Sequence, residues 1–213
     1  MIRRQAVYRI PFEVDITMLL KSIEGYRLNI RSAVRALWSG VWDYYAFIDA
    51  MSFAIERGFT QAWYEGAKIY GVNPSELTEE EHMRLTQEVN TETGFINGLG
   101  QAIMANTKVM GGKLTPLITR AELWVSGYNR VRILGSSYAA KDQKLQFNLG
   151  MSKEHCVDCT KYNGRIYRAS TWRKYDIQPR SYSLACRGYN CLCFFSPTNA
   201  HATPGFPPRP SGR

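Results

Sequence analysis

HCVDC at residues 155–159 and CRGYNCLC at residues 186–193 contain all five cysteines of this 213-residue chain. Zinc binds four ligands in a tetrahedron, and thiolate sulfur is one of its preferred ligands. The Cys156-x-x-Cys159 pair can direct two sulfurs at one ion from a tight turn. The 26 residues before Cys186 are enough to bring the second group alongside. Clustered cysteines in a reducing cytosol favour metal binding, so we predict a zinc-binding module near the C-terminus.

The two cysteine groups offer more ligands than one zinc ion needs. The candidate ligands are Cys156, Cys159, Cys186, Cys191 and Cys193. We expect the first three and one of the last two to bind, with Gly188 letting the backbone fold back and His155 orienting or packing. Because four thiolates close the coordination shell, a structural ion is favoured over a catalytic one. Two other interpretations stay open, namely reduced buried thiols without metal and a redox pair.

The sequence beyond residue 141 changes from helical to strand-like patterns. LQFNL at residues 145–149 alternates apolar and polar side chains, as does RIYR at 165–168 after the hairpin-forming pair Asn163-Gly164. These patterns predict a small zinc-stabilised β-hairpin module over residues 141–196. Five of the nine prolines follow within 17 residues, so residues 197–213 are expected to form a flexible, proline-rich tail.

Residues 12–140 are predicted to form a helical body, which makes the fold mainly α. One helix is expected from Thr17 towards Trp38. A second is expected from Val41 to about Tyr70, where GVNP at residues 71–74 provides a stop signal.

Two further helices complete this predicted body. The capping box from Thr78 to Glu81 begins one that runs to about Val109 and is expected to bend or break at Gly94, Gly98 and Gly100, which weaken it. The next has the clearest periodicity, and the residues off its apolar face are Arg120, Glu122, Asn129, Arg130 and Arg132. That face consists of Leu117, Ala121, Trp124, Tyr128 and Val131.

Positive charge is concentrated near the C-terminus. Residues 151–213 carry a net charge of +7, whereas the first 150 residues carry only +2. A basic surface of this kind favours contact with DNA phosphate or an acidic protein face. The candidate contact residues are Arg165, Arg168, Arg173, Lys174 and Arg187. No signal peptide or membrane-spanning segment is expected, which favours a cytosolic protein.

Sequence signatures of common enzyme classes are missing. The chain has no H-E-x-x-H, no zinc-deaminase pattern, no P-loop and no G-x-S-x-G. A zinc hydrolase or nuclease would require an open coordination position beside a carboxylate such as Asp158. We therefore expect no enzymatic activity.

Several motifs resemble those of the minor head, or head morphogenesis, proteins of tailed bacteriophages. They are RAELW at 120–124, KLQF at 144–147, HCVDC at 155–159, NGRIY at 163–167 and, after Cys186, CLC at 191–193. The likeness is best over about residues 115–195. The Mu-type family typically ends in H-P-x-C-R-C. Cys186 stands roughly where that histidine would be, and Leu192 replaces the usual arginine.

The resemblance implies a minor component of the virion or procapsid. Such proteins are made in the host cytoplasm, associate with the portal or other capsid proteins and with packaged DNA, and assist head assembly or genome delivery. The alternatives are a zinc-ribbon nucleic-acid-binding protein and, less favoured, a zinc-dependent hydrolase or nuclease.

Overall fold

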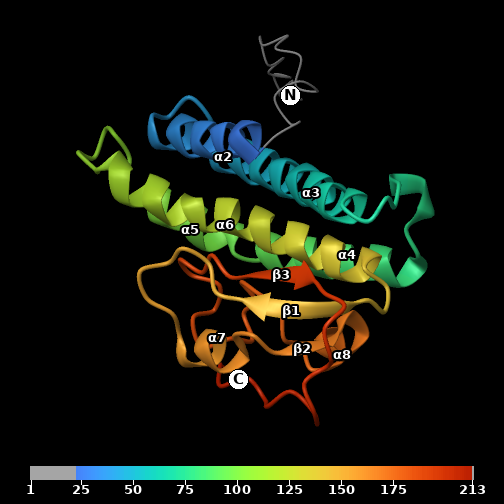
Figure 1. Ribbon diagram of the computed structural model, residues 1–213. Helices are drawn as coiled ribbons and strands as arrows, with labels where there is room; N and C mark the ends of the chain where they lie inside the picture. Colours follow the sequence, from blue (N-terminus) through green and yellow to red (C-terminus); the bar gives the residue numbers. More distant parts are fainter. Residues whose placement is uncertain (1–22, 213) are drawn as a thin grey trace.

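The computed structural model describes residues 23–212, which form a helical body followed by a small β module (Figure 1). The body comprises α2 (Ile23–Trp38), α3 (Tyr44–Lys68), the 3-10 turn η1 (Pro74–Glu76), α4 (Glu79–Thr93), α5 (Ile96–Met104) and α6 (Leu114–Ala139). The module comprises β1 (Lys144–Asn148), α7 (Val157–Tyr162), β2 (Ile166–Arg168), α8 (Ala169–Lys174) and β3 (Phe194–Pro197). The mainly α fold is thus confirmed. Residues 12–22, including the expected helix start at Thr17, lie outside the described residues.

The two longest helices, α3 and α6, cross so closely that their backbones touch. A Cβ atom on Gly66 would overlap the Arg132 carbonyl, and one on Gly135 would overlap the Trp63 carbonyl. Only glycine permits this approach. In Figure 1, α2 and α3 lie above α6, and the module lies below it.

The apolar face predicted for α6 is buried in the body's core. Its five residues are each 7% exposed or less. The core also takes large side chains from α2 and α3, among them Tyr26, Phe59 and Trp63. Among the described residues, no helix combines the length and apolarity needed to cross a membrane.

The helix predicted from residue 78 is two helices. Thr78 and Glu81 form the expected capping box, with the Thr78 oxygen accepting a hydrogen bond from the Glu81 amide at 3.3 Å. Gly94 ends α4, and α5 begins at Ile96. The break near Gly94 is therefore confirmed.

Arg130 departs from the sequence prediction, because it is buried although it lies off the apolar face of α6. Its guanidinium forms ion pairs with Glu88 and Glu92 of α4, the second at 2.7 Å. Arg84 also pairs with Glu88, at 2.7 Å. A buried charge is tolerated only when it is paired and hydrogen-bonded, and here α4 supplies both partners.

The module is an antiparallel sheet in the order β2-β1-β3. Leu145 of β1 pairs with Tyr167 of β2 on one side and with Pro197 of β3 on the other. The first two strands agree with the predicted pattern. Asn163 and Gly164 do form a turn, but it is a type II turn that joins α7 to β2 rather than one strand directly to the next.

A second core lies between the sheet and the short helices. Trp172 of α8 is fully buried, donates from its indole N–H to the Leu145 carbonyl at 2.9 Å, and contacts the rings of Phe147, Tyr162 and Tyr167. This aromatic cluster continues into the thiols of the cysteines.

The module is anchored to the helical body by hydrogen bonds from its polar side chains. Arg173 donates to the carbonyls of Ser137 and Lys141 at the end of α6. Gln178 donates to the Arg130 carbonyl at 3.3 Å, and the Tyr182 hydroxyl donates to Glu92 at 2.5 Å. Each contact joins residues distant in sequence.

The C-terminal tail differs from the flexible segment that its composition predicts. Beyond Pro197, which ends β3, it runs without regular structure along the module and forms hydrogen bonds with it between Thr198 and Ser211. Thr203 exchanges two hydrogen bonds with Ile166, and Tyr162 donates to the Pro208 carbonyl at 2.7 Å. Proline keeps this tail extended, while its carbonyls remain free to accept these bonds.

The helix crossing gives a first prediction. Gly135→Ala should destabilise the protein by about 1–3 kcal/mol, because the added methyl overlaps backbone and forces the helices apart. Gly98→Ala is the matched control within a helix. Its Cβ would meet only the flexible end of Arg120 at 3.3 Å, so it should be neutral or stabilise by up to about 1 kcal/mol. Urea unfolding of both variants measures the difference. Equal stability of the two variants would contradict the close crossing.

Candidate metal centre

The first two cysteines are positioned by the start of α7. Cys156 is the N-cap residue, with extended backbone angles, and its sulfur accepts a hydrogen bond from the Cys159 amide at 3.4 Å. This is the arrangement in which a capping side chain folds back over the first turn of a helix. It brings Cys156 and Cys159 to one side of the turn.

The other three cysteines come from a loop whose backbone folds back sharply. Arg187, Gly188 and Asn190 all have positive φ angles. A Cβ atom on Gly188 would overlap the Arg180 carbonyl, so glycine is required there for space as well as for conformation. The predicted role of Gly188 is therefore confirmed.

The five sulfurs form two groups that share Cys159. One group contains Cys156, Cys159 and Cys186, the other Cys159, Cys191 and Cys193, and within each group all sulfurs lie within 4.8 Å of one another. Cys159 and Cys191 are separated by 3.8 Å between sulfurs. All five are free thiols. This cluster could hold a metal ion.

The structure changes which cysteines compete to be the fourth metal ligand. Cys191 and Cys193 both lie beside Cys159, because side chains two residues apart in an extended segment share one face. Cys159 is therefore the central sulfur, with Cys156 and Cys186 on one flank and Cys191 and Cys193 on the other.

His155 lies next to one of these flanks. Its Nδ1 atom is 3.9 Å from the Cys193 sulfur. Cys193 is fully buried, whereas Cys156 lines a surface cleft together with His155, Cys159, Cys186 and Cys191. The cluster is thus open to solvent on the side of Cys156.

The close sulfurs perturb one another's protonation. Contacts with the thiols of Cys159, Cys186 and Cys193 hold the pKa of Cys191 far below its usual range. Contacts with Cys186, Cys191 and Cys193 raise the pKa of Cys159. A proton shared among close sulfurs occupies the position that a metal ion takes when it binds thiolates.

Asp158, between the first two cysteines, holds two segments of chain that are distant in sequence. Its buried carboxylate accepts hydrogen bonds from the Ala185 amide at 2.8 Å and from the Ser211 amide at 2.9 Å, and it pairs with Lys161 at 2.8 Å. Burial opposes its charged form, but Lys161 and these amides lower its pKa overall. It therefore fastens the tail and the loop before Cys186 to α7.

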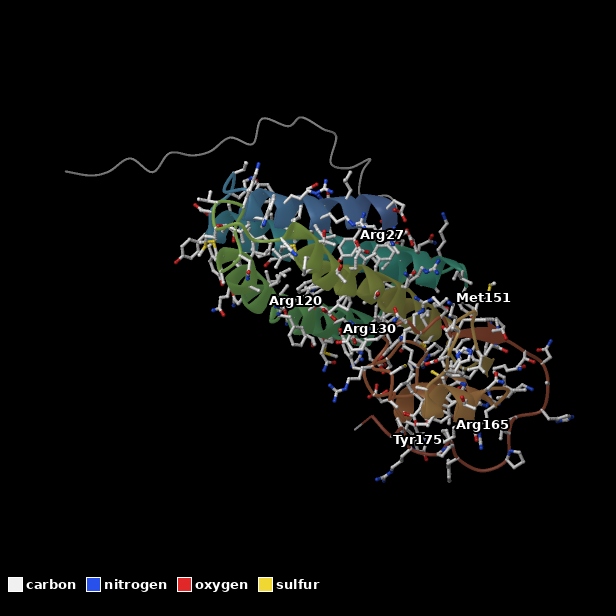
Figure 2. The ribbon with its side chains drawn as sticks, turned by 90° about the vertical axis from the view of Figure 1, so that its left-hand side faces the viewer. Arg27, Arg120, Arg130, Met151, Arg165 and Tyr175 are labelled. Atoms are coloured by element: carbon white, nitrogen blue, oxygen red, sulfur yellow. The ribbon has the colours of Figure 1, made fainter. Side chains whose placement is uncertain are left out.

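The five basic residues predicted to contact a partner do not form one free surface. Arg173 is engaged with the end of α6, Arg168 pairs with Asp142 at 2.8 Å, and Arg165 donates to the Lys161 carbonyl at 2.8 Å. Figure 2 shows Arg165 at the end of the module far from the helical body. In residues 23–212, Lys174 and Arg187 make no side-chain hydrogen bond or ion pair.

Two residues of the site have roles that the sequence pattern does not predict. The pattern presents Asp158 only as a neighbour of a catalytic metal, although an acid in the first turn of a helix signals a capping or anchoring role. Arg180, which interacts electrostatically with Cys191 and Cys193, gave no signal at all.

Comparisons with known proteins do not place this chain in a family. No protein-family model matches it, and no similar protein was found among curated sequences or solved structures.

Metal binding gives a second prediction. Purified protein should contain one tightly bound metal ion, and Cys159→Ser should abolish binding because both sulfur groups share Cys159. Of the two variants Cys156→Ser and Cys193→Ser, one should still bind one metal ion per protein molecule. Elemental analysis of protein prepared without chelator measures this. Native protein without metal, or a Cys159→Ser variant with a full equivalent, would contradict the centre.

The carboxylate anchor gives a third prediction. Asp158→Asn should destabilise the protein by about 2–3 kcal/mol at neutral pH, because it removes a charge that meets several donors. It should also speed hydrogen exchange in residues 203–212, measured by mass spectrometry. Asp49→Asn, at an exposed carboxylate of α3, is the control and should change neither.

The same anchor has a defined pH dependence. Because the pKa of Asp158 is lower in the folded than in the unfolded protein, its contribution is complete above roughly pH 4 and is lost as pH falls through the folded-state pKa. Acid unfolding of the two Asn variants should therefore diverge from wild type only for Asp158. If Asp158→Asn left hydrogen exchange in residues 203–212 unchanged, contacts other than those of Asp158 would hold the tail.

Proposed function

We propose that this chain is a structural minor head protein of a tailed bacteriophage, with a C-terminal module organised by a structural zinc ion. The observation that carries the proposal is that Cys156-x-x-Cys159 and Cys191-x-Cys193, both part of the resemblance to that family, meet in one thiol cluster. The resemblance covers about residues 115–195, which correspond to α6 and the module.

The donor set supports zinc as the metal. Sulfur ligands select zinc over hard cations such as magnesium and calcium. Tetrahedral zinc with Zn–S bonds of about 2.3 Å places its sulfurs about 3.8 Å apart. The Cys159–Cys191 separation of 3.8 Å agrees with this value. Four thiolates would close the shell, which supports a structural rather than a catalytic ion.

The ion would act by joining α7 to the loop that contains Cys186, Cys191 and Cys193. The same module is anchored to α6 through Arg173, so a folded module would give the helical body a defined basic end. We propose that this end contacts the portal or other capsid proteins in the virion. The virion would be assembled in the host cytoplasm. Lys174 and Arg187 are the most available for packaged DNA.

A zinc-ribbon nucleic-acid-binding protein is the second candidate. The net charge of +7 on residues 151–213 favours it. Against it, three of the five candidate arginines and lysines are engaged inside the protein, at Arg165, Arg168 and Arg173. Fewer free cations predict weaker phosphate binding and a smaller salt dependence.

The function gives a fourth prediction. In virions of a phage that encodes this chain, quantitative mass spectrometry should detect it at low copy number. When co-expressed with the portal protein of the same genome, it should co-elute with it and contain zinc. The Cys159→Ser variant should lose this association, whereas Gly98→Ala, the control, should retain it.

Absence of the chain from purified virions would contradict the phage assignment. Salt-sensitive binding to duplex DNA without any capsid association would instead favour the zinc-ribbon candidate. Zinc-loaded protein whose portal association survives Cys159→Ser would show that the metal centre has no part in assembly.

A further inference from the structure

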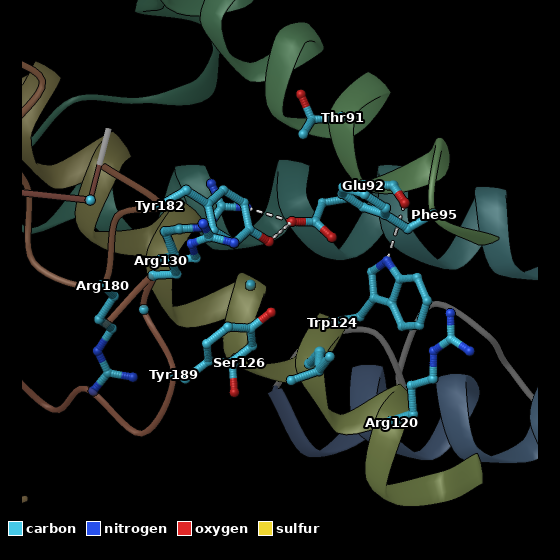
Figure 3. Close-up of a pocket in the computed structure, with 15 residues that line it drawn as sticks. Thr91, Glu92, Phe95, Arg120, Trp124, Ser126, Arg130, Arg180, Tyr182 and Tyr189 are labelled. Atoms are coloured by element: carbon cyan, nitrogen blue, oxygen red, sulfur yellow. Dashed lines mark hydrogen bonds and ion pairs between the residues drawn. The ribbon is translucent and has the colours of Figure 1, made fainter. Parts of the chain in front are cut away.

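A groove separates the helical body from the loop that leads to the last cysteines. We call it the arginine groove; it is lined by Phe95, Arg120 and Trp124 of the body and by Arg180, Arg187 and Tyr189 of the module. Its cavity is about 470 Å³, within the range of about 300–1,000 Å³ that small-molecule sites occupy. Figure 3 shows Arg180 and Tyr189 on one side, with Trp124 and Arg120 on the other.

The walls of this groove carry unneutralised positive charge. In the described part of the chain, Arg120 and Arg187 make no side-chain hydrogen bond or ion pair. Arg180 has a buried Nε that meets no acceptor, and burial lowers the pKa of its guanidinium.

The acidic side chain in the groove does not offset these cations. Glu92 is buried, and its carboxylate is already bound by Arg130 and by the Tyr182 hydroxyl. The Arg130 guanidinium also lies over the Tyr182 ring, 4.4 Å from its centre. This closed set leaves Arg120 and Arg187 as the groove's arginines without a charged partner among the described residues.

Aromatic rings are exposed beside the cations. Phe95 is 57% exposed and Tyr189 is 52% exposed, on opposite sides of the groove. Between them, Trp124 is held in place by a hydrogen bond from its indole N–H to the Glu92 carbonyl at 3.3 Å. Exposed rings next to arginine suit a flat, conjugated group that can stack on them.

From this combination we infer that the arginine groove binds a nucleoside phosphate. Guanidinium groups match phosphate oxygens bidentately, and the base would stack on Tyr189 or Phe95. A simple anion would use only the arginines, and an apolar ligand only the rings. The inference stands on the groove itself and does not depend on the phage assignment.

The metal centre would shape this groove. Arg187 and Tyr189 lie between Cys186 and Cys191, so both belong to the loop that the sulfur cluster closes. The Arg180 carbonyl packs against Gly188 of the same loop. The cations and the ring on the module side are therefore held in place together.

Calorimetric titration of the native protein with adenosine 5′-monophosphate tests the inference. We expect saturable binding with Kd on the order of 100 µM, and binding at least about tenfold weaker for adenosine and for inorganic phosphate. Arg187→Met should weaken binding of the nucleotide about tenfold or more, since it removes a charged hydrogen bond to phosphate. Tyr189→Ala should lower the affinity for the nucleotide but leave the affinity for inorganic phosphate unchanged.

Arg35→Met is the matched control, because it removes the same charge from an exposed side chain outside the groove. It should bind the nucleotide as wild type does, and circular dichroism checks that every variant is folded. No saturable binding at about 5 mM nucleotide would overturn the inference. The inference would also be overturned if Arg187→Met and Tyr189→Ala left nucleotide binding unchanged. The same holds if N-acetylglutamate, an acid without base or phosphate, bound as tightly as the nucleotide.

Discussion

The close crossing of α3 and α6 is the contact on which the rest of the structure depends. Gly66 and Gly135 let the two longest helices meet backbone to backbone, and Phe59, Trp63 and Val131 are buried in the core that these helices share. Helix α2 then covers both, with the Tyr26 ring against Gly58 and Tyr128. Because α6 is packed by α3 from above, its other side is free to carry α4 and the module.

The module is too small to build a large core of its own and relies on three kinds of contact. Its aromatic core is centred on Trp172, its cysteines offer a site for a metal ion, and its polar side chains reach α4 and α6. In small domains a bound metal and docking onto a larger neighbour replace missing hydrophobic burial. The buried Arg130 lies where these two bodies meet, because only there do Glu88, Glu92 and Tyr182 converge.

One loop belongs both to the cysteine cluster and to the arginine groove. Between Arg180 and Cys193 the chain forms part of the arginine groove and supplies three of the five sulfurs. Its positive φ angles and the contact of Gly188 with the Arg180 carbonyl allow only a narrow set of backbone shapes. A metal ion held by these cysteines would therefore be coupled to the shape of the groove through the backbone of this loop.

The amino-acid sequence by itself determined the features that depend on near neighbours. Helical periodicity placed the core face of α6, a capping box began α4, glycine ended it, and paired cysteines marked the cluster that could hold a metal ion. Tertiary structure alone decided that β3 joins the sheet, that Arg130 is buried, that Arg173 anchors the module, and that Asp158 holds the tail. Each of these depends on a partner 30 or more residues away. Local spacing cannot specify such a partner, because burial of charge and pairing of strand edges are settled only when distant segments meet.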